Sequence, residues 1–244
     1  MLDTAVIPCG GLGTRLAPIT RWLPKEMLPV GLRPVLHWVL DEAADAGLVR
    51  AVVVTNPLKP VLEAAARTYP GPLELEFVPQ DHPHGLGDAL LRARDQLEAA
   101  AFAVLLPDHL FQGPNPTRAV IETHRATGLA TVLLSESPPK DPDADEPSTR
   151  VTTARAADGT LRVTGLGAGS ARLAGRAVFP GDVFLEFDAV ARDLPPGSEL
   201  DDRPVLERLA RRGALAAVLS RATLYEVGLP EGYRDAVAGF PARA

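Results

Sequence analysis

Short apolar runs alternate along the chain with stretches in which apolar residues recur at helical spacing. The run Thr4–Ile7 is apolar, partly β-branched and followed by Pro8 and a glycine cluster, which predicts a buried strand that opens into a loop. Between Pro34 and Gly47 the apolar residues recur every three or four positions, and these two residues suit the first turn and the C-terminal cap of a helix. The same patterns predict strands at 51–55, 73–78, 102–106 and 130–135, and helices at 60–67, 88–98 and 116–127.

This alternation of strands and helices indicates an α/β fold. Strands joined through helices require crossover connections, so we expect a mainly parallel sheet sandwiched by helices. Ligands of such sheets bind at the carboxyl ends of the strands. The loops after Ile7, Val78 and Leu106 take that position, and we expect the functional residues there.

The second half of the chain is less regular. The pair Asp158-Gly159 predicts a hairpin turn, which adds antiparallel strands and makes the sheet mixed. The segment 137–148 is rich in proline and aspartate, and its aspartates are spaced as in a calcium loop, but Glu146 stands where that loop needs glycine, so we expect a surface loop. The remaining expected elements are strands at 151–155, 161–166 and 214–219, and helices at 183–193, 203–212 and after Pro230.

Composition and charge exclude several classes of protein. The chain has 244 residues, a length that α/β proteins commonly form as one domain. Its formal net charge is −6 and it has no Lys/Arg-rich block, which argues against a nucleic acid or an anionic membrane as partner. No apolar run approaches the roughly 20 residues that span a bilayer, and the first residues lack a basic segment before an apolar one, so we expect a cytoplasmic protein. The single cysteine, Cys9, excludes an internal disulfide, and we expect it to be a small buried side chain rather than a nucleophile.

The glycine-rich segment after the first strand is a candidate phosphate site. Gly10, Gly11 and Gly13 let backbone N–H groups approach an anion closely, and a concave run of such donors attracts phosphate. A Walker loop would end in Gly-Lys-Ser/Thr, which is absent. The dinucleotide fingerprint would have a third small residue where this chain has Leu16. Neither common motif therefore applies, and a nicotinamide-dependent oxidoreductase is disfavoured.

Two cations and a run of prolines follow the glycines. The prolines at positions 18, 24 and 29 prevent a single helix, so we expect an extended arm that carries Arg15 and Lys25 across the strand ends. Arginine makes forked contacts to phosphate oxygens, and lysine supplies a point charge. Two cations beside a glycine loop suit a triphosphate together with a second phosphate.

The run from Gly11 to Val30, with Pro24-Lys25-Glu26-Met27-Leu28-Pro29 at its centre, resembles the signature of the sugar-phosphate nucleotidyltransferases. It is most similar to that of bacterial UTP:glucose-1-phosphate uridylyltransferases. The resemblance implies a Rossmann-like domain over 1–244, with a nucleotide-binding half at 1–135 and a sugar-phosphate-binding half at 136–244. It also implies synthesis of a nucleotide-sugar from UTP or dTTP and a sugar 1-phosphate, with magnesium as cofactor and release of pyrophosphate. Whether the chain forms a homo-oligomer is left open.

Two further segments agree with this resemblance. Gln80 precedes Gly85 by the spacing that the family uses to recognise a pyrimidine base, and an amide offers the donor and acceptor that an imide edge needs. Asp108 resembles the family's strand-end magnesium ligand, and Glu226 stands at its second magnesium position. The resemblance thus implies the following roles: catalysis for Arg15, Lys25 and Asp108; nucleotide binding for Gly10, Gly11, Gly13, Thr14, Arg15, Gln80 and Gly85; metal binding for Asp108 and Glu226; and sugar binding for Gly175 and Glu199.

The chain departs from the family pattern at two places. Where the family has Glu-Lys-Pro for the sugar and its phosphate, this chain has Gly167-Ala168-Gly169. At the second magnesium position the family has Asp, whereas Glu226 is one methylene longer. An alternative function follows, a nucleotide-binding homologue that has lost catalysis and acts as a regulatory or interaction protein.

Overall fold

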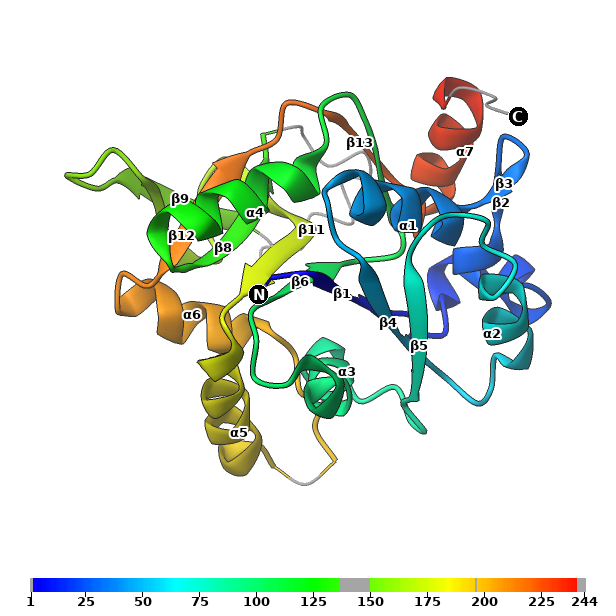
Figure 1. Ribbon diagram of the computed structural model, residues 1–244, viewed down its shortest axis with the longest axis horizontal. Coiled ribbons are helices and arrows are strands. Elements are labelled where there is room, and N and C mark those ends of the chain that lie inside the picture. Colours follow the sequence, from blue (N-terminus) through cyan, green and yellow to red (C-terminus); the bar gives the residue numbers. More distant parts are fainter. Residues whose placement is uncertain (1, 137–149, 196, 241–244) are drawn as a thin grey trace.

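A nine-stranded sheet forms the centre of the computed structural model, which describes residues 2–136, 150–195 and 197–240. The strands lie in the order β5-β4-β1-β6-β11-β8-β12-β10-β9 (Figure 1). Their bounds are β1 Thr4–Pro8, β4 Arg50–Thr55, β5 Glu74–Pro79, β6 Phe102–Leu105, β8 Ala130–Ser135, β9 Arg150–Arg155, β10 Leu161–Leu166, β11 Ala171–Phe179 and β12 Leu215–Leu219.

The sheet is mixed, as the sequence predicts. Strands β5, β4, β1 and β6 are parallel neighbours, and β12 is parallel to β8. Strand β11 is antiparallel to both of its neighbours, β6 and β8, and β9 and β10 form the predicted hairpin. At the hairpin turn the Asp158 side chain accepts a hydrogen bond from the Thr160 N–H, and Gly159 has a φ of +80°. The predicted α/β fold with a mainly parallel mixed sheet is confirmed.

Helices cover both faces of the sheet (Figure 1). A hydrophobic core lies on each face of the sheet. Successive side chains of a strand point to opposite faces, so Ala5 and Ile7 pack in one core and Val6 packs in the other. This arrangement explains why the first strand is an uninterrupted apolar run. The first core contains α1 Val35–Asp45, α2 Pro60–Ala66, α4 Pro116–Thr127 and α7 Pro230–Gly239, and the second contains α3 Leu86–Arg92, α5 Phe184–Asp193 and α6 Arg203–Arg211.

Two small sheets and several 3-10 turns position the loops. The hairpin of β2 (Pro29–Val30) and β3 (Arg33–Pro34) precedes α1, and β7 (His109–Gln112) pairs with β13 (Thr223–Glu226). The β7–β13 pair brings residues 223–226 beside the loop that follows β6. The 3-10 turns are η1 Thr14–Leu16, η2 Ile19–Arg21, η3 Lys25–Met27, η4 Arg94–Leu97 and η6 Gly181–Val183.

Three expectations need correction. The segment after the glycines is not an extended arm but a series of 3-10 turns, because short turns accommodate prolines that a longer helix could not. The helix expected at 88–98 ends at Arg92 and continues as η4, since Glu98 and Ala99 take positive φ values that no helix allows. Strand β11 was not predicted. The segment 137–148 lies outside the described residues. No helix in the described part of the chain combines the length and apolar character that crossing a bilayer requires.

Candidate functional site

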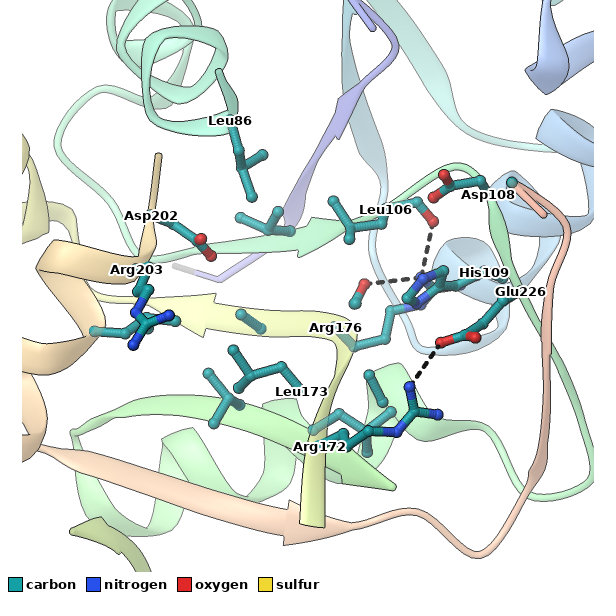
Figure 2. A pocket seen from close by; sticks show the side chains of 18 of the residues that line it. Leu86, Leu106, Asp108, His109, Arg172, Leu173, Arg176, Asp202, Arg203 and Glu226 are labelled. Atoms are coloured by element: carbon teal, nitrogen blue, oxygen red, sulfur yellow. Dashed lines mark hydrogen bonds and ion pairs between the residues drawn. The ribbon is translucent and has the colours of Figure 1, made fainter. Parts of the chain in front are cut away.

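Two adjoining cavities lie at the carboxyl ends of β1, β5 and β6. The larger, of about 470 Å³, is lined by Gly10, Gly11, Lys25 and Gln80, and we name it the glycine-loop cavity. The smaller, of about 280 Å³, is lined along β11, and we name it the β11 cavity (Figure 2). Asp108 lines both cavities, together with Leu86 and Leu106, so the two open onto the same carboxylate.

A buried ion pair holds the junction between β1 and the glycine loop. The Lys59 ammonium donates to the Cys9 carbonyl at 2.8 Å and lies 3.0 and 3.1 Å from the two carboxylate oxygens of Glu26. Asn56 donates to the Gly10 carbonyl at 2.9 Å. Burial raises the pKa of Glu26, although the charges of Lys59 and Lys25 oppose this shift. These contacts fix the start of the loop from side chains far along the chain.

Cys9 is buried at this junction, as the sequence predicts. Burial raises the pKa of its thiol well above the ordinary value, and the charge of Glu26 raises it further. A thiol with a raised pKa is neutral at physiological pH and is a poor nucleophile. The side chain therefore packs in the core and carries no chemistry.

Gln80 is buried where the β5 loop meets the glycine loop. Its Nε2 donates to the Gly85 carbonyl at 3.1 Å and to the Asp88 carboxylate at 2.8 Å. Because the nitrogen is bound within the protein, the side-chain oxygen remains as the acceptor for an imide N–H. A Cβ on Gly10 would lie 1.9 Å from that oxygen, so only glycine allows Gln80 its position.

Asp108 and Lys25 form a short ion pair at the meeting point of the cavities. The Lys25 Nζ lies 2.5 Å from Asp108 Oδ2. Burial alone would raise the pKa of Asp108, but the charges of Lys25 and His109 and the hydrogen bond from Lys25 outweigh it and hold the pKa well below its usual range. Burial likewise lowers the pKa of Lys25, and the charges of Asp108 and Glu26 more than restore it. Both groups are therefore charged at neutral pH.

The loop that carries Asp108 is held by a fully buried arginine. Arg176 uses each of the five N–H donors of its guanidinium. Two go to the carboxylate of Glu42 at 2.8 Å each, and three go to backbone carbonyls at 2.8 to 3.0 Å. Those carbonyls belong to Leu106, Gly175 and His109, so the arginine ties the chain on both sides of Asp108 to β11.

Glu226 lies next to the same loop. In the β7–β13 ladder it stands opposite His109, and the following residue, Val227, donates its N–H to the Asp108 carbonyl at 2.8 Å. Gly228 packs so closely that a Cβ there would lie 2.6 Å from Asp108 Oδ2. The Glu226 carboxylate itself points to Arg172, with Oε1 3.6 Å from the guanidinium (Figure 2).

The carboxylates of Asp108 and Glu226, which both line the β11 cavity, are the candidate ligands for a magnesium ion. Within the described residues, no group of three or more His, Cys, Asp or Glu side chains is arranged to hold a metal. Magnesium, however, commonly uses one or two carboxylates, several waters and the oxygens of a substrate phosphate. Asp108 is ionised, and the close contacts of Val227 and Gly228 bring Glu226 to the same loop. Two carboxylates on neighbouring segments are the number of protein ligands that such a site requires.

The structure places the predicted site residues around these two cavities, except Gly13, which lines neither. Arg15 lines the β11 cavity rather than the cavity of the glycines, and Glu199 lines the glycine-loop cavity rather than that of Gly175. Gly13 has a φ of +67°, and its carbonyl accepts a hydrogen bond from Thr20 at 2.8 Å. The residues at the glycine-loop cavity are Gly10, Gly11, Thr14, Lys25, Gln80, Gly85, Asp108 and Glu199, and those at the β11 cavity are Arg15, Asp108, Gly175 and Glu226.

Sequence reasoning missed the charged residues of the β11 cavity. Arg172 and Arg176 lie on a strand that was not predicted, and Asp202 and Arg203 lie at the start of α6. One signal was available, because two arginines interrupt a nine-residue run of otherwise small or apolar residues, Ala171–Phe179. Charged residues inside such a run indicate buried side chains with fixed partners or a ligand.

A family model described as nucleotidyl transferase matches residues 4–144. The chain belongs to the nucleotidyl transferase family. The matched range holds the glycine loop, Lys25, Gln80 and Asp108, so the resemblance that these residues carry is confirmed.

Individual members of the family are similar to the chain to different extents. UTP--glucose-1-phosphate uridylyltransferase 2 of Streptococcus pyogenes serotype M3 is 32% identical over 56% of this chain and 54% of its own length, so the chain spans about half the length of this curated relative. A protein of Bacillus subtilis named putative UTP--glucose-1-phosphate uridylyltransferase is 28% identical over 96% of this chain and 94% of its own. A solved structure of UDP-glucose pyrophosphorylase complexed with UDP-glucose shares the fold, with a TM-score of 0.85 and 22% identity over 98% of each chain.

Proposed function

We propose that this nucleotidyl transferase joins UTP or dTTP to a sugar 1-phosphate and releases pyrophosphate. One observation carries the proposal: the Lys25–Asp108 ion pair stands where a nucleotide-sized cavity meets a second cavity, and Asp108 lines both. A reaction between two phosphorylated substrates needs such a junction, with fixed charges at the point where the phosphates meet. The names of the bacterial relatives support UTP and glucose 1-phosphate as the substrate pair.

In the proposed reaction, an oxygen of the sugar 1-phosphate attacks the α-phosphorus of the nucleotide in line with the leaving pyrophosphate. The attacking phosphate is already ionised at neutral pH, so no general base is needed, and positioning and charge neutralisation supply the catalysis. Lys25 would contact the reacting phosphates, and Arg15 would contact the pyrophosphate. Gln80 and the backbone at Gly10 would read the base.

Asp108 and Glu226 would hold Mg²⁺. When bound, the ion neutralises charge on the phosphate oxygens and orients them. The carboxylate of Asp108 is kept ionised by Lys25, so it is ready to bind a cation without first losing a proton.

The test is a magnesium-dependent pyrophosphate-release assay that crosses the common nucleoside triphosphates with a panel of sugar 1-phosphates. We expect release with UTP or dTTP and at least one sugar 1-phosphate. Lys25→Gln and Asp108→Asn should each lower kcat by about two or more orders of magnitude, as removal of a transition-state contact does. Arg67→Gln is a matched control, because it removes a cation from an exposed ion pair with Glu63. Near-normal turnover in either site variant would contradict the assignment, and UTP binding without release for any acceptor would indicate a homologue without catalysis.

A further inference from the structure

The side-chain amide of Gln80 has one favourable orientation in the folded protein. An amide carries a donating nitrogen and an accepting oxygen on the same carbon, so turning it over exchanges the two. The nitrogen of Gln80 faces two groups that can only accept, the Gly85 carbonyl at 3.1 Å and the Asp88 carboxylate at 2.8 Å. In the reversed orientation the Gln80 oxygen would face both acceptors, and because the side chain is buried, water could not relieve the repulsion.

Asp88 is the stronger of the two acceptors. Its contact with Gln80 is shorter than that of the Gly85 carbonyl, and a hydrogen bond to a carboxylate is about twice as strong as one between neutral groups. The carboxylate also pairs with Arg92 at 3.4 Å. A carboxylate has no hydrogen to donate, so it cannot accommodate the oxygen of Gln80 in any rotamer. Since the other acceptor is a backbone carbonyl, the side chain at position 88 decides how the amide is oriented.

The start of α3 fixes the position of Asp88. The Gly87 N–H donates to the Leu200 carbonyl at 2.8 Å, and a Cβ on Gly85 would lie 2.4 Å from the same carbonyl oxygen. The segment at Leu200 therefore packs directly against the beginning of the helix. As a result, the first turn of α3 presents Asp88 to Gln80 from a backbone that is held on its other side.

The oxygen of Gln80 is available to a ligand. It accepts no hydrogen bond within the part of the chain that the structure describes, and it lies beside Gly10. Gln80 and Gly10 both line the glycine-loop cavity. Uracil and thymine carry an N–H between two carbonyl groups and can donate it to this oxygen, whereas cytosine has a ring nitrogen at the same place that only accepts. A site whose buried polar group is left unpaired by the wrong ligand rejects that ligand.

We propose that Asp88 determines the base preference of this protein: by holding the amide nitrogen of Gln80, its carboxylate makes the cavity bind UTP or dTTP and reject CTP. This inference rests on the proposed function, since it concerns the nucleotide of that reaction. Asp88 acts through Gln80 and is a positioning residue. A carboxylate in the first turn of α3 also favours the helix through its macrodipole, so the test must separate base preference from stability.

The test compares the binding of UTP and CTP to Asp88→Asn by calorimetry in the presence of Mg²⁺. Asparagine keeps the size of aspartate but offers a donor as well as an acceptor, so both orientations of the Gln80 amide become accessible. The preference for UTP, measured as the ratio of the two Kd values, should fall by about tenfold or more, because CTP binds to the reversed amide. Kd for UTP should rise by no more than about threefold, since part of the protein keeps the original orientation. Asp88→Ser, whose hydroxyl also donates and accepts, should have the same effect and replaces Asp88→Asn if that variant does not fold.

Two further variants are the controls. Arg92→Gln removes the ion pair of Asp88 but leaves the carboxylate, so its preference should equal that of the unmodified protein. Asp88→Glu keeps oxygens that only accept, so it should retain more of the preference than Asp88→Asn does. If Asp88→Asn and Asp88→Ser keep the full preference, or if Arg92→Gln loses as much of it, the inference is wrong. Equal binding of UTP and CTP by the unmodified protein would also overturn it.

The pyrophosphate-release assay separates this inference from the proposed function. A reduced preference in Asp88→Asn, without pyrophosphate release by the unmodified protein from any acceptor, supports the inference and contradicts the function. Release by the unmodified protein with UTP, together with an unchanged preference in Asp88→Asn, retains the function and overturns the inference. If the unmodified protein binds neither nucleotide, both are wrong.

Discussion

The buried pair of Glu42 and Arg176 should contribute strongly to stability, and a double-mutant cycle can measure that contribution. In Glu42→Gln the Arg176 charge stays buried without a carboxylate, and in Arg176→Met the carboxylate stays buried without its cation. Removing one partner of a buried ion pair costs about 3–5 kcal/mol. Since a change of 1 kcal/mol shifts Tm by about 2–4 °C in a chain of this size, each single variant should melt about 6–20 °C below the parent protein.

The double variant Glu42→Gln/Arg176→Met should lose less than the sum of the single variants, because no charge remains buried without a partner. Guanidinium chloride unfolding of the parent protein, the single variants and the double variant gives this coupling energy, which we expect to exceed about 1 kcal/mol. The exposed pair of Glu63 and Arg67 serves as control, since Glu63→Gln should cost at most about 1 kcal/mol. A loss below about 1 kcal/mol in Glu42→Gln, or a coupling energy near zero, would refute the reasoning.

The same variants should affect catalysis. Arg176→Met frees the carbonyls of Leu106 and His109, which lie on either side of Asp108. We expect kcat to fall by about tenfold or more at temperatures where the variant is folded, because catalytic groups require accurate placement. An unchanged kcat in a folded Arg176→Met protein would show that the loop keeps its geometry without the arginine.

Two further predictions follow from single positions. Gly10→Ala should weaken UTP binding and lower the free energy of unfolding by about 1–3 kcal/mol, because the new methyl group displaces the Gln80 amide and its two hydrogen bonds. Gly11→Ala is the control, because a Cβ at Gly11 has nothing within 4 Å, and it should unfold like the parent protein in guanidinium chloride. Equal stability of the two variants would contradict the proposed clash with Gln80. Burial, together with the Arg33 charge, lowers the pKa of His37 below its ordinary value of 6.5. The unfolded chain therefore binds more protons near pH 6 than the folded protein does. As a result, the free energy of unfolding decreases as the pH drops below about 6.5. Between pH 8 and pH 5, the free energy of unfolding should fall less in His37→Gln than in the parent protein. Identical pH profiles of the two proteins would contradict this prediction.

Local sequence patterns were sufficient to predict the strands and helices whose apolar residues recur with one regular spacing. The apolar run of β1 and the glycines after it form a buried strand and a loop at its carboxyl end, as their sequence indicates. Gln80, Gly85 and Asp108 were found from their resemblance to motifs of the nucleotidyltransferases, and the structure brings them to one cavity. Their position follows from topology, since β1, β5 and β6 all end at the same edge of the sheet.

The contacts that hold the site could not be predicted in this way. Arg176 binds Glu42 across 134 positions of sequence, and Lys59 binds Glu26 across 33. A buried charge is stable only when its partner is fixed by tertiary structure, and local hydrophobic periodicity carries no information about that partner. Strand β11 was missed for the same reason, because its arginines and its glycine at φ +66° break the pattern of a buried strand.

The contacts of Glu226 connect the two departures from the family pattern, the longer acidic side chain at the second metal position and the missing Glu-Lys-Pro. Glu226 replaces the shorter Asp, and its carboxylate reaches the guanidinium of Arg172, a residue of the half that lacks Glu-Lys-Pro. In the free protein the two charges neutralise each other in a largely buried cavity. The extra methylene of Glu226 thus carries its carboxylate toward a cation of β11, so the change at the second metal position and the altered second half of the chain meet at one ion pair.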